Sequence, residues 1–183
     1  MKICVFAMVV SYLIWGGSSV LAQSLDETRA KAEKGEAAAQ HELGEMHVEG
    51  RGVAKDGMAA VRWYRKAAEQ GDVDAQSNLG DIYFAGTSVA KDLTEAAKWY
   101  RMAAEKGDGK AQDHLGVMYF DGLGVAKNEA ESVAWLRKAV DQGYPSAQSN
   151  LGVAYVKGRG VAKDDVEAVK LFRKAAEKGD AKV

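Results

Sequence analysis

The stretch AQSNLGDIYFAGTSVAKDLTEAAKWYRMAAEKGDGK, residues 75–110, decides the fold because the chain contains four related copies of it without insertion or deletion. Each copy is 36 residues long, and eleven of the 36 positions carry the same residue in all four. Self-similarity at such a period is typical of repeat architectures, in which each unit buries its apolar face against its neighbours. The copies are residues 39–74, 75–110, 111–146 and 147–182.

Each copy is predicted to form two helices. In the first half of the copy at 75–110, Ala75, Leu79 and Ile82 have the spacing of one helical face, and Gly86 ends the pattern. Apolar residues on one such face are what a helix buries against a partner. The second half shows the same spacing at Ala96, Trp99, Tyr100, Ala103 and Ala104.

Capping residues mark the predicted helix ends. An Asp or Asn precedes each second helix, and in three copies a Glu follows three residues later, which is the capping-box spacing. Sixteen of the 20 glycines, counting Gly35, fall on four repeat positions, which indicates left-handed C-caps or close helix approach. The predicted caps of second helices are Asp56, Asp92, Asn128 and Asp164, with Glu95, Glu131 and Glu167 after three of them. First helices are predicted to begin at Asp72, Asp108 and Pro145.

The two ends of the repeat array differ from its middle. Residues 23–38 form a half-repeat, in which Glu27 to Gly35 is similar to a second helix without its first, and we expect it to cap the array. The sequence stops at Val183, where a fifth copy would begin, so we expect an apolar edge there that favours self-association. The predicted fold is therefore all-α, with four helical hairpins and an N-terminal half-repeat.

The repeat pattern resembles the Sel1-like repeat family, a relative of the tetratricopeptide repeats. That resemblance implies a right-handed α/α superhelix, a solenoid, that acts as an adaptor, and many bacterial members of the family are exported. The chain departs from the family pattern at His47, Thr87-Ser88, Ser132 and Leu171. The copy at 75–110 carries the pattern as Ala75, Leu79, Gly80, Tyr83, Gly86, Val89, Asp92, Ala96, Trp99, Tyr100, Ala103, Ala104 and Gly107.

Residues 1–22 have the pattern of a secretory signal peptide. A positive Met1-Lys2 precedes the apolar run from Ile3 to Trp15, and Val20-Leu21-Ala22 places small residues before a cleavage site at Gln23. An uncleaved anchor is the alternative, although a membrane span needs about 20 apolar residues. Cleavage would remove Cys4, the only cysteine, so the mature protein would have no disulfide bond, thiolate nucleophile or cysteine-based zinc site.

Charge and composition exclude several classes of protein. The 25 Lys and Arg residues against 26 Asp and Glu give a formal net charge of −1, without the basic excess of nucleic-acid binders. The chain is 47% hydrophobic, which excludes a disordered tail protein. We therefore expect no nucleic-acid partner, and nothing in the sequence indicates a cofactor.

No catalytic or metal site emerges from the sequence. The histidines His41, His47 and His114 have no second histidine at ligand spacing and no carboxylate cluster, so ordinary packed or half-exposed imidazoles are predicted. The segment Ser88-Val89-Ala90-Lys91 fits the S-x-x-K signature of serine β-lactamases. However, Val-Ala-Lys also follows Gly in the other copies, so this Ser is predicted to lie in a loop. A hydrolase of cell-wall or β-lactam substrates, similar to the cysteine-rich branch of the family, stays the alternative function.

Three sets of residues recur at fixed repeat positions. The tryptophans are predicted to be core residues. The lysines and arginines could form a basic ladder, but acidic neighbours favour a salt-bridged, solvated face. These sets are Trp63, Trp99 and Trp135; Lys55, Lys91, Lys127 and Lys163; and Arg65, Arg101, Arg137 and Arg173.

A variable stripe on the first helices is the predicted partner-binding surface. By similarity to tetratricopeptide repeats it lines the concave face. Phe84 and Phe120 hold the same position in successive copies and are predicted anchors, unless they pack between hairpins. Asp81 and Asp113 flank them and favour an extended partner with apolar and basic side chains. The stripe comprises His41, Glu45 and Val48; Ser77, Asp81 and Phe84; Asp113, Val117 and Phe120; and Ser149, Val153 and Val156.

Together these patterns predict an exported, non-enzymatic adaptor, periplasmic or secreted. Its predicted partner is a protein or an extended peptide held in the concave face. We expect no stable membrane insertion after the signal peptide is cleaved.

Overall fold

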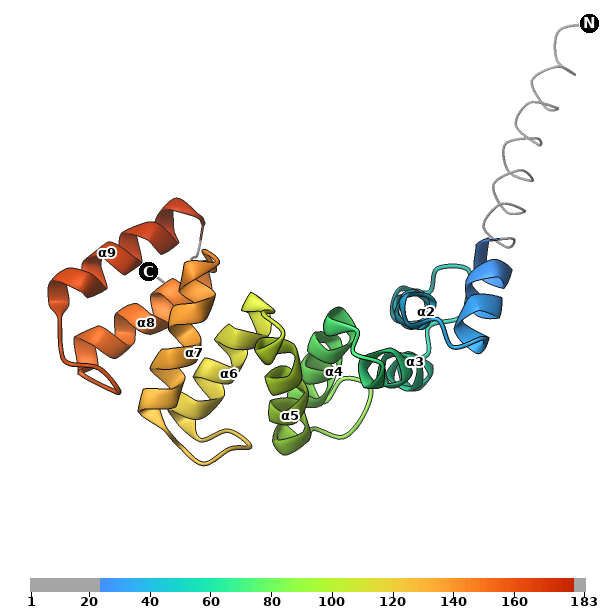
Figure 1. Ribbon diagram of the computed structural model, residues 1–183, viewed down its shortest axis with the longest axis horizontal. Helices are drawn as coiled ribbons and strands as arrows, with labels where there is room; N and C mark the ends of the chain where they lie inside the picture. The colour runs from blue at the N-terminus through green and yellow to red at the C-terminus, as the bar shows by residue number, and fades with distance from the viewer. Residues whose placement is uncertain (1–23, 180–183) are drawn as a thin grey trace, which may run out of the picture. The chain divides into compact units, whose positions relative to one another are not determined.

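A computed structural model describes residues 24–179 of the chain (Figure 1). Within this range residues 24–33 are helical, eight helices of 13 residues follow, and there is no strand. The helices are α2 (Ala37–Glu49), α3 (Gly57–Glu69), α4 (Val73–Ala85), α5 (Leu93–Glu105), α6 (Gly109–Asp121), α7 (Glu129–Asp141), α8 (Pro145–Lys157) and α9 (Asp165–Glu177). The prediction of an all-α chain of helical hairpins is confirmed.

Side-chain caps begin the second helix of every hairpin. Asp92 Oδ1 accepts hydrogen bonds at 3.0 Å from the N–H groups of Thr94 and Glu95 in the first turn of α5. Such a cap satisfies N–H groups that lack a partner within the helix. The same contact is made by Asp56, Asn128 and Asp164, and among first helices Asp108 caps α6 while Pro145 opens α8. These helix starts are predicted correctly from the sequence.

Glycine closes the helices as predicted. After α5, Gly107 adopts a left-handed φ of +100°, a conformation in which a Cβ atom would be strained. Its N–H group bonds to Ala104 O at 3.1 Å, and the N–H group of Asp108 bonds to Ala103 O at 3.1 Å. This pair of bonds is a Schellman closure, which satisfies carbonyls at the end of α5 and turns the chain into α6.

The described chain forms two compact units, one ending at Asp72 and one beginning at Val73. In the first unit, helix 24–33 packs with the hairpin of α2 and α3. Its core includes Leu25, Leu43 and Met46, and Trp63 packs half-buried against them. Thr28 of the first helix donates to Glu42 of α2 at 3.4 Å.

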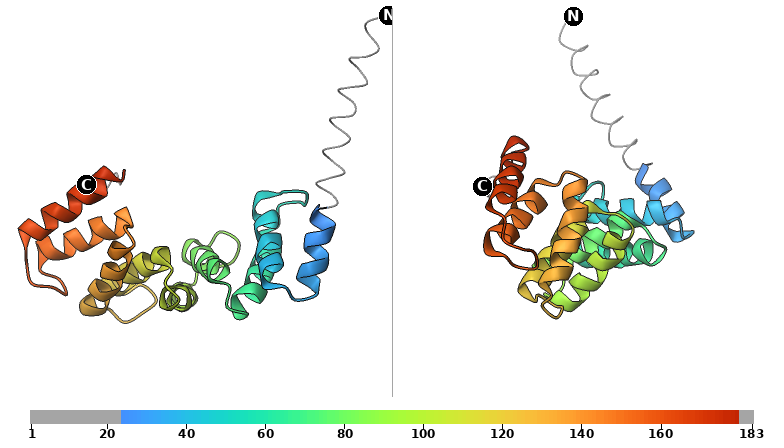
Figure 2. Two further views of the ribbon diagram at one scale, coloured as in Figure 1. Left: turned by 45° about the horizontal axis from the view of Figure 1, so that its top comes forward. Right: turned by 60° about the vertical axis from the view of Figure 1, so that its left-hand side comes forward.

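The second unit holds three hairpins, α4–α5, α6–α7 and α8–α9. Helix α5 packs against α6, and α7 against α8, so each hairpin stacks on the next. Figure 2 shows α8 and α9 side by side, and the core between them and α7 includes Leu136, Leu151 and Leu171. Trp99 and Trp135 are buried, as the repeat position predicted.

Polar contacts join successive hairpins of this unit. Gln112 Nε2 in α6 donates to Ala104 O in α5 at 3.1 Å. Arg137 in α7 donates to the hydroxyl of Tyr155 in α8 at 3.2 Å, and Arg101 makes the same contact one repeat earlier. Arg101 and Arg137 therefore link repeats through tyrosine hydroxyls, whereas two of the recurrent lysines form salt bridges, Lys127 with Glu129 and Lys163 with Asp165.

Two predicted features fall outside the described residues. They are the predicted signal peptide, residues 1–22, and the end of the chain, residues 180–183. Among residues 24–179, no helix has the length and apolar content to span a bilayer.

Candidate functional site

A pocket of about 210 Å³ opens between α6 and α8, the first helices of the last two hairpins. Leu136 of α7 lies buried at its base, 1% exposed. Its wall combines apolar side chains with a few polar groups, as small binding sites do. The lining residues are Val117, Phe120 and Asp121 of α6, Leu136 of α7, Asn150, Val153 and Lys157 of α8, and Arg159.

Arg159 covers the Phe120 ring. The guanidinium carbon lies 3.6 Å from the ring centroid, which is a cation–π contact. Arg159 Nε donates to Glu129 Oε1 at 2.7 Å, and Nη2 donates to Phe120 O at 3.1 Å. Hydrogen bonds from Arg159 and Lys127 hold the pKa of Glu129 below its usual value. Arg159 is therefore fixed at the rim of the pocket by three contacts.

Asn150 is oriented by a buried carboxylate. Asp113, 8% exposed, accepts hydrogen bonds from Asn150 Nδ2 at 2.9 Å and from Ser146 Oγ at 2.5 Å. Because Nδ2 is bound to Asp113, the other amide atom of Asn150, Oδ1, is presented as an acceptor. The pocket thus offers an oriented hydrogen-bond acceptor beside its apolar wall.

The equivalent place one hairpin earlier is filled. There Tyr100 stands where α7 has Leu136, and His114 stands where α8 has Asn150. The two rings stack, with centroids 4.8 Å apart and planes at 14°, and Phe84 lies 6.1 Å from His114. The pocket exists at Phe120 because smaller side chains replace these two rings.

Asp81 ties the filled site together. It accepts hydrogen bonds from the Tyr100 hydroxyl at 2.8 Å and from Lys110. Burial, with the charge of Asp81, raises the pKa of Tyr100 well above its usual value. Burial lowers the pKa of His114, although Asp81 opposes the shift.

The structure brings together three of the predicted stripe residues, Val117, Phe120 and Val153, at the pocket. Val156 of the same stripe is exposed, whereas Ser77, Asp113 and Ser149 are buried. In each of these three helices the first of the three stripe residues points into the hairpin stack. A partner would therefore contact the second and third stripe residues of each helix.

The remaining stripe residues lie elsewhere. In the first unit, His41 lies 3.8 Å from Glu45 and 3.9 Å from Asp72, and Val48 is exposed. Asp81 is engaged by Lys110. Since Asp113 is buried and Asp81 is paired, the expected acidic border that would select basic side chains is not available at the pocket.

Sequence reasoning missed Arg159, Asn150, Lys157 and Leu136. Arg159 occupies the variable position between two recurrent glycines, where the other copies have Arg51, Thr87 and Leu123. Leu136 and Asn150 fall on core and packing positions of the repeat. The sequence does show that both are smaller than Tyr100 and His114, the residues at the matching positions one repeat earlier. That difference indicates a pocket only once the helices are known to be adjacent.

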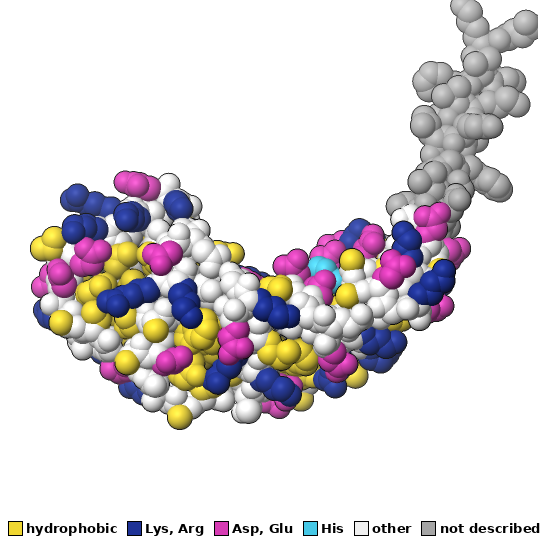
Figure 3. Space-filling view, in the orientation of Figure 1, with side chains coloured by type: hydrophobic (Ala, Val, Ile, Leu, Met, Phe, Trp, Pro, Cys, Tyr) yellow, Lys and Arg dark blue, Asp and Glu magenta, His cyan; other side chains and the backbone are white. Residues whose placement is uncertain are grey.

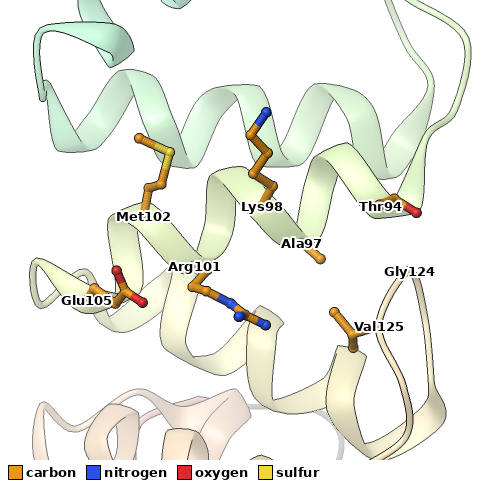
Figure 4. A pocket seen from close by; sticks show the side chains of 8 residues that line it. All are labelled: Thr94, Ala97, Lys98, Arg101, Met102, Glu105, Gly124 and Val125. Atoms are coloured by element: carbon orange, nitrogen blue, oxygen red, sulfur yellow. The ribbon is translucent and has the colours of Figure 1, made fainter.

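A second pocket, of about 300 Å³, lies on α5 (Figure 4). Lys98, Arg101, Met102 and Glu105 project from the helix, and Val125 comes from the loop after α6. Charges of both signs are interspersed with apolar side chains over the face shown in Figure 3. Two of its polar groups make contacts on the exposed surface: Arg101 donates to the Tyr119 hydroxyl, and Lys98 donates to Glu95 at 3.4 Å.

The S-x-x-K segment and His47 lie in ordinary structural positions. Ser88 and Lys91 lie in the loop before α5 and not one turn apart on a helix, as the S-x-x-K mechanism requires. His47 is half-buried. Among residues 24–179, no group of three or more His, Cys, Asp and Glu side chains is arranged to hold a metal ion.

Sequence comparison finds the Sel1 repeat in four copies, at residues 37–72, 73–108, 109–144 and 145–180. These copies begin two residues before the blocks defined from the sequence above and have the same period. A search of curated proteins gave no match.

Solved structures include several with the same fold. A protective antigen of uropathogenic Escherichia coli that displays an SLR fold is 46% identical, with a TM-score of 0.81, and the match covers 85% of this chain but 33% of the antigen. A Sel1 repeat protein from Oxalobacter formigenes is 36% identical, with a TM-score of 0.82, over 95% of this chain and 71% of the other. The cysteine-rich protein B of Helicobacter pylori is 29% identical, with a TM-score of 0.53, over 69% of this chain and 94% of the other.

Proposed function

Because the chain belongs to the Sel1 repeat family, whose repeats are scaffolds that commonly mediate protein–protein interactions, we propose that it is an exported, non-enzymatic scaffold that binds an extended peptide segment of a protein partner at the α6–α8 pocket. Stacked hairpins give a preformed surface, so that binding costs little ordering of the scaffold.

The observation that carries this proposal is the pocket itself. It forms at variable positions of the first helices, and its apolar wall of Val117, Phe120 and Val153 coincides with the stripe predicted from the sequence. A volume of about 210 Å³ suits one or two apolar side chains and not a whole substrate. Recognition of a side chain on a longer partner fits this size.

The partner's chemistry follows from the pocket's groups. An apolar side chain would insert against Phe120, and a backbone N–H group of the extended peptide would donate to Asn150 Oδ1. Lys157 and Asp121 stand at the exposed rim with opposite charges and supply no net preference. The pocket is therefore proposed to prefer a partner with an apolar side chain and an adjacent backbone N–H group, and not the basic side chains expected from the sequence.

A filled-pocket variant tests the proposal. Val117→Asp, Leu136→Tyr and Asn150→His together copy the residues found at the preceding hairpin, where Asp81, Tyr100 and His114 occupy the space. The variant should fold, since this side-chain set already packs in the same chain. A partner captured from an envelope extract by the wild-type protein should be lost by the variant. Equal capture by both proteins would refute the pocket as the binding site.

Export is the second part of the proposal and rests on residues 1–22. Protein purified from the native host should begin at Gln23, because Val20-Leu21-Ala22 precedes it. The measurement is N-terminal sequencing of the mature protein. Recovery of a chain that still begins at Met1 would contradict export with cleavage.

A further inference from the structure

The outer face of α9 exposes an apolar side chain at a position that is buried in the preceding hairpins. Val169 is 48% exposed, whereas its counterparts Val133 in α7 and Ala97 in α5 are 3% exposed. Val166, one turn earlier on α9, is 68% exposed and adds to the apolar surface, at a position that is exposed in α5 and α7 as well. Among the described residues, α8 packs on one side of α9 and no helix packs on the other (Figures 1 and 2).

The same face of α5 shows what covers it inside the repeat stack. Helix α6 packs there and makes three specific contacts. Gln112 donates to Ala104 O, Arg101 donates to the Tyr119 hydroxyl, and the backbone of Gly124 approaches Leu93 so closely that a Cβ atom would lie 2.0 Å from Leu93 O. The apolar contact is therefore accompanied by two hydrogen bonds and one close backbone approach.

Helix α8 and its following turn cover α7 with two of these three contacts. Arg137 donates to the Tyr155 hydroxyl at 3.2 Å. A Cβ atom on Gly160 would lie 2.1 Å from Glu129 O. The arginine–tyrosine hydrogen bond and the close backbone approach of a glycine therefore occur twice within the unit.

Helix α9 carries the receiving half of this contact set. Arg173 matches Arg101 and Arg137, Ala176 matches Ala104, and Asp165 matches Leu93 and Glu129 at the helix start. Phe172, half-buried against Gly152, matches Tyr100 and Leu136, which are fully covered. Helix α9 therefore has the residues that α5 and α7 use to contact the next first helix, and among the described residues no such helix contacts them.

We propose that this α9 face binds a helix of a second protein molecule that carries the first-helix pattern A-Q-x-x-L-G-x-x-Y. The Gln of the incoming helix would donate to Ala176 O, and its Tyr would accept a hydrogen bond from Arg173. Its apolar face would cover Val169 and Phe172. The internal copies define this partner chemistry, because a tyrosine of α6 and of α8 accepts from the arginine of the helix it covers, and the glutamine of α6 donates to Ala104 O. The site is separate from the α6–α8 pocket.

A peptide taken from the chain itself provides the probe. Residues 145–163, PSAQSNLGVAYVKGRGVAK, contain α8 and its following turn. The labelled peptide is titrated into the full chain and fluorescence anisotropy is measured. Saturable binding is expected. A peptide with Leu151→Arg, which places a charge on the packing face, should bind at least tenfold more weakly.

Protein variants place the binding on α9. Val169→Asp introduces a charge at an exposed position of the face and should weaken binding tenfold or more, with helicity by circular dichroism unchanged. Lys174→Asp adds the same side chain elsewhere on α9 and should leave the affinity within about twofold. The proposal is overturned if the wild-type protein shows no saturable binding, or if Val169→Asp binds the peptide as tightly as wild type.

Discussion

Gly80 in α4 and Tyr100 in α5 are packed so closely that a Cβ atom on Gly80 would lie 2.5 Å from two carbons of the tyrosine ring. The pair recurs in each hairpin, with Gly44, Gly116 and Gly152 facing Tyr64, Leu136 and Phe172 at comparable distances. Real Cβ contacts do not reach this distance, so the absence of a side chain sets the spacing between the two helices of a hairpin.

Substitution of Gly80 therefore tests hairpin packing. Gly80→Ala should lower the free energy of unfolding by about 1–3 kcal/mol, although alanine is intrinsically the better helix former. Denaturant titration followed by circular dichroism measures the loss. In a Tyr100→Ala background the ring is absent, so the added methyl group should cost less or become stabilising. An equal loss in both backgrounds would show that the ring is not the cause.

The helix starts and the glycine positions could be predicted from the sequence because they depend on local chemistry. An Asp at the N-cap, as at Asp92, or a Gly with left-handed φ, as at Gly107, acts within a few residues of chain. The period of 36 residues then fixes which positions are equivalent. The hairpins follow from these two kinds of information together.

The candidate site could be predicted only in part. The stripe includes Phe120 and Val153 because they vary on one helical face. The side chain of Arg159 reaches Phe120 from a loop 39 residues later, and the inward direction of Asp113 depends on how hairpins stack. Both depend on tertiary contacts, which the periodicity of a single helix cannot predict.

Two glutamines form a contact within the hairpin of α6 and α7 that the next hairpin does not repeat. Gln142 Nε2 donates to Gln112 Oε1 at 2.8 Å, so the buried amide oxygen of Gln112 has a hydrogen-bond donor. At the next hairpin Lys178 occupies the donor position and bonds to Gly143 O, and the buried Oε1 of Gln148 has no hydrogen-bond partner among the described residues. An unpaired buried acceptor costs stability.

Two opposite substitutions check this contact. Gln142→Ala should lower the free energy of unfolding by about 1–3 kcal/mol, because it leaves Gln112 Oε1 unpaired. Lys178→Gln should raise it by about 0.5–1.5 kcal/mol, because it supplies the donor that Gln148 lacks. Thermal unfolding of both variants beside wild type gives the comparison. If Gln142→Ala loses no stability and Lys178→Gln gains none, the assignment of this contact is wrong.

His114 makes stability depend on pH. Burial lowers its pKa in the folded protein, while nearby Asp81, Asp113 and Asp108 oppose the shift and Lys110 adds to it. A histidine with a lowered folded pKa binds protons more readily when unfolded. The stability is therefore complete above the unfolded pKa, about 6.5, and declines as pH falls from there through the folded pKa.

His114→Asn removes this dependence. Asparagine already occupies the matching position at Asn150, so the variant should fold. The unfolding midpoint of wild type should fall between about pH 7 and pH 5, and the fall should be smaller in the variant. Urea titrations across this range provide the measurement. Parallel curves for the two proteins would assign the pH dependence to other groups.

Phe84 and Phe120 occupy equivalent positions, yet their surroundings predict different consequences of truncation. Phe84 packs in the filled site with Tyr100, at 6.5 Å, and with His114. Phe120 lines the open pocket beneath Arg159. Phe84→Ala should therefore mainly lower the free energy of unfolding, by less than the roughly 3–5 kcal/mol of a fully buried Phe, because the ring is half-buried.

Phe120→Ala should instead mainly weaken partner capture. An aromatic anchor in a pocket contributes about 2 kcal/mol or more to binding, so the dissociation constant should rise at least tenfold. The loss of the cation–π contact to Arg159 should cost about 0.5–1 kcal/mol of stability. Pull-down efficiency and denaturation midpoint are measured on both single variants, because only their pairing separates the roles. If Phe120→Ala retains full capture while Phe84→Ala loses it without unfolding, the partner binds at the hairpin of α4 and α5, and the pocket assignment is wrong.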